Sequence, residues 1–127
     1  MNKARLVCAI LLALPLIGFG ASYFIPGIEP PPPPDPEASG VKLIEAMRAG
    51  GLMAPIAASH VLIGLLLLVP RTRFVGAMLQ LPMSVGILAF HMTMLPAGNA
   101  LAIVILAINC FVIADRTRLR ALLGTTG

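Results

Sequence analysis

The sequence predicts an all-α fold: an integral membrane four-helix bundle, arranged up-down-up-down, with both termini cytoplasmic. Three observations lead to this prediction, namely the composition, four long apolar stretches and the alternation of charge between them. Of the 127 residues, 58% are hydrophobic and 11% are charged. A soluble domain carries about 25% charged residues. The chain therefore has too few polar side chains to cover a water-soluble globule.

Four ranges contain no Asp, Glu, Lys or Arg: 6–25, 53–69, 74–95 and 101–114. Crossing the hydrocarbon core of a bilayer takes about 20 apolar residues, with a usable range of about 17–25. The first three ranges meet this length, and the fourth meets it if its helix starts near Asn99. We therefore expect helices over about residues 5–25, 53–69, 74–95 and 99–115, which form a single transmembrane domain over residues 1–127.

Basic residues gather at the ends of alternate stretches. Seven of the nine Lys and Arg residues flank what would be one side of the membrane: Lys3, Arg5, Arg71, Arg73, Arg116, Arg118 and Arg120. The positive-inside rule assigns such flanks to the cytoplasm. This predicts a multi-pass protein of the cell inner membrane. The same placement argues against a nucleic-acid partner, which would require a basic patch on one face of a soluble fold.

The start of the chain also fits a signal peptide, since Lys3 and Arg5 precede an apolar run and Gly18-Phe19-Gly20 offers small residues for cleavage. Cleavage would leave three spans. The apolar run continues through Ile25, beyond that site, which favours an uncleaved first span.

Two further segments lie between the first and second stretches. Residues 26–40 form a Pro-rich linker with five consecutive prolines at 30–34, which favour stiff polyproline II. Residues 41–49 alternate apolar and charged side chains with a helical period, which predicts a short interfacial helix. We expect both segments on the outer side.

Polar residues inside the apolar stretches are the candidate ligand-binding residues, because hydrocarbon makes them costly. They are His60, Gln80, Ser84 and His91, with Asn109 nearby in the last stretch. Gln80, Ser84 and His91 stand at positions i, i+4 and i+11, which fall on one stripe of a helix. We expect this stripe to face the bundle.

A helical rise of about 1.5 Å per residue gives the depth of each polar residue from the basic end. His60 and Ser84 lie about 16 Å from it, Gln80 and Asn109 about 10 Å, and His91 about 27 Å. The offset between the two histidines disfavours a haem with bis-His ligation. Two histidines are also too few ligands for a metal site. A quinone or lipid headgroup near His91 is one interpretation. In the other, His60 bonds Ser84 or backbone across helices, and His91 faces outer water.

No nucleophile triad, phosphate-cradling glycine loop or carboxylate pair occurs in the sequence. No acidic residue lies within the four stretches, so a carboxylate proton relay has no candidate. The sequence therefore predicts a protein that is not an enzyme.

Several segments, in their order along the chain, resemble those of a known protein family. They are LIEAMRAGG at 43–51, GLLLL at 64–68, LPMSVGILAFH at 81–91 and the turn Pro96-Ala97-Gly98. Together they resemble the DoxX-like family of small bacterial integral membrane proteins. The resemblance implies a four-helix membrane bundle and a link to respiratory or thiol-redox systems, since the family name comes from a small quinol-oxidase subunit. Many relatives carry Glu where this chain has His60, so carboxylate chemistry does not carry over.

These observations predict a non-enzymatic membrane protein that serves as an accessory subunit of a redox or quinone-linked complex, with the lipid bilayer and other subunits as partners. Two alternatives are also compatible with the sequence. One is a small transporter or channel lined by Gln80, Ser84 and His60, which requires a homo-oligomer because four helices are too few for a pore. The other is a structural module that holds an outer partner through the Pro-rich arm.

Overall fold

Four long helices make up most of the computed structural model, which describes residues 2–124. They are α1 (Lys3–Phe24), α3 (Met53–Leu68), α4 (Arg73–Thr93) and α5 (Asn99–Ile113). The described part also contains α2 (Ser39–Ala49), the short 3-10 helix η1 (Pro96–Gly98) and α6 (Arg116–Leu122), and it contains no strand. The all-α prediction is therefore confirmed.

Three helical ranges are long and apolar enough to cross a membrane: Lys3–Phe24, Arg73–Thr93 and Pro96–Ile113. A fourth candidate is the pair α2 and α3, which pass the same test together but are bent by 94° at the break between them. The structure thus supports an integral membrane protein with three or four candidate spans.

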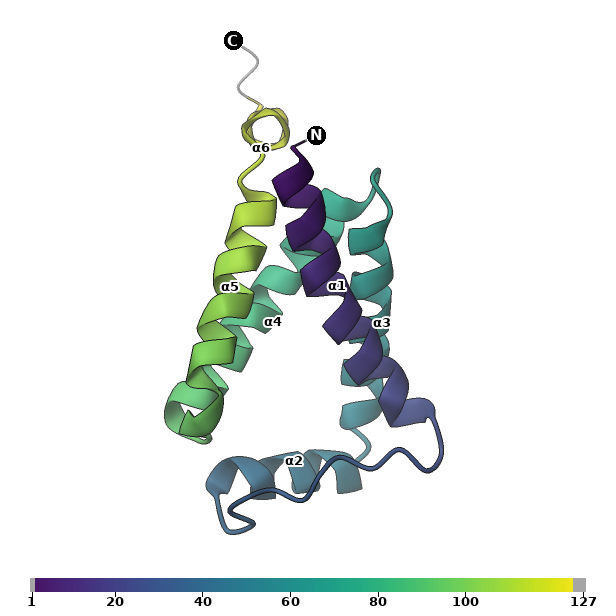
Figure 1. Ribbon diagram of the computed structural model, residues 1–127, viewed down its shortest axis with the longest axis vertical. Helices are drawn as coiled ribbons and strands as arrows, with labels where there is room; N and C mark the ends of the chain where they lie inside the picture. Colours follow the sequence, from purple (N-terminus) through teal and green to yellow (C-terminus); the bar gives the residue numbers. More distant parts are fainter. Residues whose placement is uncertain (1, 125–127) are drawn as a thin grey trace.

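The long helices form a ring in which each packs against two neighbours. Helix α1 contacts α3 and α5, and α4 contacts α3 and α5. The start of α1, the turn between α3 and α4, and α6 lie at one end of the molecule, which we call the basic end (Figure 1). Helix α2 lies across the opposite end (Figure 1). This arrangement brings residues from both ends of the chain together at the basic end.

Small residues bring α1 and α3 into close contact. A Cβ atom at Gly20 of α1 would lie 2.4 Å from the carbonyl oxygen of Ala57 in α3. A Cβ atom at Gly64 of α3 would lie 2.5 Å from the Ile17 side chain of α1. Glycine and alanine at helix interfaces let backbones approach closely, which is the usual basis of helix association in membranes. These glycines fix where α1 crosses α3.

Apolar side chains form the core and are also exposed on the outer surface. The buried cluster comprises Ala9, Leu12, Ala13, Leu16, Ile63, Leu67, Ala77 and Val112. Large apolar side chains are also exposed on every long helix, such as Leu11, Leu62, Val85 and Val104. Exposed apolar side chains on every long helix are typical of a membrane or protein contact.

Helix α2 bridges the ends of α4 and α3. The Gly40 amide donates to the Met94 carbonyl at 3.3 Å, and a Cβ atom at Gly40 would lie 3.0 Å from both Met94 O and the Phe90 ring. Val41 is buried beside this contact. Gly51, with φ +78°, permits the turn into α3. The expected interfacial helix is therefore packed against the bundle at its first residues.

The last helix, α6, was not among the expected elements. Asp115 caps it, since one carboxylate oxygen accepts from the amides of Thr117 at 3.1 Å and Arg118 at 3.4 Å. An Asp that precedes a short run of good helix formers is a typical N-cap signal. The basic tail expected to follow the fourth stretch is thus helical and begins at Arg116.

Candidate functional site

Three polar side chains form a buried cluster between α4 and α5. Gln80, Ser84 and Asn109 are each 0% exposed. The Gln80 amide donates to Ser84 Oγ at 3.3 Å, and Ser84 Oγ donates to Asn109 Oδ1 at 3.0 Å. The Asn109 amide in turn donates to the Ala77 carbonyl at 2.9 Å. The expected stripe of α4 is therefore buried at Gln80 and Ser84, and its partner is α5.

The cluster holds helices together and lacks a reactive group. Amide and hydroxyl groups do not titrate near neutral pH, so the cluster can donate and accept hydrogen bonds but cannot supply an acid or a base. Gln80 Oε1 is buried and has no hydrogen-bond partner within residues 2–124. A buried acceptor without a partner costs free energy, so this oxygen is the one point of the cluster where a further donor would be stabilising.

We expect Ser84 and Asn109 to be energetically coupled. Ser84→Ala and Asn109→Ala should each lower the free energy of unfolding by about 1 kcal/mol, with a coupling energy of about 0.6 kcal/mol in a double-mutant cycle. Reversible unfolding in mixed detergent micelles measures these values. Thr93→Ala is the control, because the exposed Thr93 hydroxyl bonds only Ala89 O of its own helix. Strict additivity of the two changes would contradict the coupling.

His60 faces α1 and does not join the cluster. Its Nδ1 lies 2.7 Å from Ile56 O of its own helix, and its ring packs edge-on against Phe19, with centroids 5.3 Å apart. The expected bond to Ser84 or to backbone across helices is therefore wrong, because Nδ1 bonds the carbonyl four residues earlier in the same helix. Gln80, Ser84 and His60 do not line a common path in the described structure.

His91 closes the turn between α4 and α5. Its Nδ1 lies 2.9 Å from Leu95 O, and its ring lies edge-on to Phe90 with centroids 5.3 Å apart. A Cβ atom at Gly98 would lie 2.1 Å from His91 Cε1, so the imidazole occupies the space that glycine leaves. The ring of His91 is half-buried against this turn, so it is only partly available to water or to a ligand.

The hydrogen bond to Leu95 O fixes the tautomer of His91. A ring nitrogen that bonds a carbonyl must carry the proton, so Nε2 is the acceptor when the imidazole is neutral. The structure does not bring the two histidines together, because His60 packs on Phe19 of α1 and His91 on Gly98. Within residues 2–124, no group of three or more His, Cys, Asp or Glu side chains is placed to hold a metal ion.

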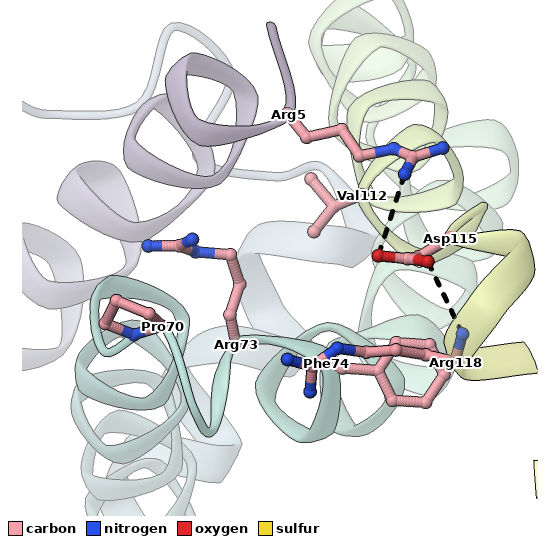
Figure 2. Close-up of a pocket in the computed structure, with 7 residues that line it drawn as sticks. All are labelled: Arg5, Pro70, Arg73, Phe74, Val112, Asp115 and Arg118. Carbon is pink, nitrogen blue, oxygen red and sulfur yellow. Dashed lines mark hydrogen bonds and ion pairs between the residues drawn. The ribbon is translucent and has the colours of Figure 1, made fainter. Parts of the chain in front are cut away.

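A second candidate site is a pocket at the basic end, with a volume of about 230 Å³ (Figure 2). It is lined by Arg5, Pro70, Arg73, Phe74, Val112, Asp115 and Arg118, and we call it the arginine pocket. The charge pattern of the sequence predicts that its arginines lie on one side of the membrane, but it does not predict that they line one pocket.

Two arginines of this pocket hold helix ends together. Arg73 is 5% exposed, and its guanidinium donates to the carbonyls of Leu67 at 2.8 Å and Leu68 at 3.1 Å at the C-terminus of α3. A cation there is favoured by the negative end of the helix dipole. Arg5 donates to Ala114 O and lies 3.7 Å from the Asp115 carboxylate, which ties α1 to the α5–α6 junction.

An apolar groove of about 570 Å³ lies between the C-terminal end of α1 and residues 58–65 of α3. Its lining consists only of apolar residues, among them Phe24, Val61 and Leu65. It offers no polar group to orient a ligand and suits an acyl chain or an apolar partner surface.

Comparisons of this chain with protein-family models, with curated proteins and with solved structures found no match.

Proposed function

We propose that the chain is a multi-pass protein of the cell inner membrane, with four spans in an up-down-up-down order and both termini in the cytoplasm. The basic end supports this orientation, because the start of α1, the α3–α4 turn and α6 carry seven of the nine Lys and Arg residues and share one end of the molecule (Figure 1). In this orientation the Pro-rich linker and α2 lie on the outer side.

We infer further that the protein is a non-enzymatic accessory subunit of a membrane complex. One observation supports this proposal: the buried polar side chains make structural hydrogen bonds, and the exposed side chains of the long helices include many large apolar ones. The polar side chains buried within residues 2–124 are held by structural hydrogen bonds: Arg73, Ser84 and Asn109 bond another helix, while His60 and Gln80 bond a residue of their own helix. Large apolar side chains point outward from every long helix. Such side chains suit packing against lipid and partner subunits, and no set of reactive groups converges within residues 2–124.

The resemblance to DoxX-like proteins supports a redox or quinone-linked complex. His91 is the group we assign to the reduced form of a quinone, a quinol, since it lies near the expected outer boundary of the bilayer. Its Nδ1 is held by Leu95 O, so the neutral ring presents Nε2 as an acceptor. An acceptor pairs with the hydroxyl of a quinol rather than with the carbonyl of a quinone. The channel alternative receives less support, because Gln80 and Ser84 are fully buried against Asn109 while His60 packs on Phe19.

Purification of the full chain from membranes in a mild detergent tests this proposal. We expect subunits of a quinone-linked complex to co-purify, and lipid extracts to contain quinol. His91→Asn should lower the bound quinol about tenfold, because Asn can still donate to Leu95 O but lacks the second ring nitrogen. Thr93→Ala, two residues away and exposed, is the control. A protein that purifies alone and without quinol would refute the proposal.

A further inference from the structure

The arginine pocket carries a net positive charge that the protein itself leaves uncompensated. Three arginines and one aspartate line it, a formal charge of +2 (three minus one). The arginines come from three elements, Arg5 from α1, Arg73 from the start of α4 and Arg118 from α6, and Figure 2 shows the Arg73 guanidinium turned toward Pro70. Both carboxylate oxygens of Asp115 already have partners, since one accepts from the α6 amides and the other lies 3.7 Å from Arg5.

Two of the arginines retain donors without acceptors. The Arg118 guanidinium has no hydrogen bond or ion pair with another described residue, although its backbone amide bonds Asp115. Arg5 Nε is buried and has no hydrogen-bond partner in residues 2–124. Arg73 differs, because its guanidinium caps α3 and contributes charge rather than an available donor. Unused guanidinium donors, here on a half-buried and an exposed arginine that line one pocket, suit an acceptor with several oxygens.

The size and the lining of the pocket limit the kinds of ligand that it can bind. Its volume of about 230 Å³ far exceeds the roughly 30 Å³ that one water occupies in the liquid. Pro70, Phe74 and Val112 give it apolar walls beside the guanidinium groups. These walls suit a phosphate that carries a small organic group, such as a glycerol, better than they suit a fully hydrated ion.

We propose that the arginine pocket binds the phosphate group of an anionic ligand, through Arg118 and Arg5. In the proposed orientation this pocket meets the cytoplasmic leaflet, whose anionic headgroups attract basic residues. An anionic phospholipid is therefore one source of the phosphate, and a soluble phosphate compound is the other. Only the lipid source rests on the proposed orientation, since a phosphate can enter the pocket whichever side of the membrane it faces.

Binding to the full-length protein in neutral detergent micelles tests the proposal. Native mass spectrometry and thermal unfolding are measured with phosphatidylglycerol, with phosphatidylcholine and with inorganic phosphate. We expect preferential binding of phosphatidylglycerol over phosphatidylcholine, and about a tenfold loss of affinity in Arg118→Gln. Arg116→Gln is the matched control, because Arg116 is an exposed arginine of the same helix that does not line the pocket. Its affinity should change less than about twofold.

Each result of these binding measurements either supports or overturns the proposed phosphate site. Binding of phosphatidylglycerol but not of inorganic phosphate, lost in Arg118→Gln and in Arg5→Gln, supports a lipid site. Binding of inorganic phosphate with the same dependence on Arg118 supports a soluble phosphate compound. Equal losses in Arg118→Gln and Arg116→Gln would mean that only general surface charge matters and would overturn the proposal. Equal binding of phosphatidylglycerol and phosphatidylcholine, without any effect of phosphate, would overturn it as well.

Discussion

Gly20→Leu is expected to force apart α1 and α3 and to lower the free energy of unfolding by about 3 kcal/mol. The first atom of the new side chain would already lie 2.4 Å from Ala57 O and 2.8 Å from Val61 Cγ2. Because Ala57 O belongs to the helix backbone, no side-chain rotation relieves this contact, and the helices must separate. Unfolding in mixed detergent micelles, followed by circular dichroism, measures the loss.

Gly18→Leu is the matched control for this substitution. Gly18 lies two residues earlier in α1, and a Cβ atom there would meet nothing within 4 Å. Both changes replace the flexibility of glycine with the same helix-forming residue. We expect the control to change stability by less than about 0.5 kcal/mol. Equal destabilisation by both substitutions would mean that α1 does not cross α3 at Gly20.

Arg73→Met should be the second most damaging change, with a loss of about 2–3 kcal/mol. Arg73 supplies charged donors to the Leu67 and Leu68 carbonyls, and methionine has a long side chain but no donor. These carbonyls belong to the last turn of α3 and have no later residue of their own helix to bond. The expected result is a frayed α3 end, visible as faster hydrogen exchange at that turn and as a lower midpoint of unfolding.

Arg71→Met separates this effect from the loss of a positive charge. Arg71 is exposed and precedes Arg73 by two residues in the same turn, so both variants remove one charge from the same flank. The control should unfold within about 0.5 kcal/mol of the natural protein. If both variants lose stability equally, the capping role of Arg73 is wrong.

The helices and the buried stripe were predictable because they depend on local patterns. Apolar runs of span length gave the four long helices, and a shared face of α4 placed Gln80 and Ser84 inward. The equal depth expected for Gln80 and Asn109 agrees with their link through Ser84 in the structure. The direction of His60 was not predictable in the same way. It depends on the rotation of α3 against α1, which the close contact at Gly20 sets from a distant part of the chain.

The arginine pocket could not be predicted from the sequence, because it also depends on how distant parts of the chain pack. Charge patterning assigns Arg5, Arg73 and Arg118 to one side of the membrane, but their convergence depends on the ring order of the helices. The local signal for α6 was Asp115, a good N-cap residue before the basic tail. That signal predicts where a helix starts. It does not predict the contact between Arg5 and Asp115, which places Asp115 in the wall of the pocket.

The 94° bend between α2 and α3 also has a consequence for the surrounding lipid. The 16 residues of α3 rise about 24 Å, whereas the hydrocarbon core is about 30 Å thick. The 22 residues of α1 rise about 33 Å on the other side of the shared interface. In the proposed orientation, this hydrophobic mismatch thins the bilayer beside α3 and not beside the exposed face of α1. A neighbouring subunit with a short span would relieve the mismatch. Packing of a partner against α3 should therefore release more free energy than packing against α1.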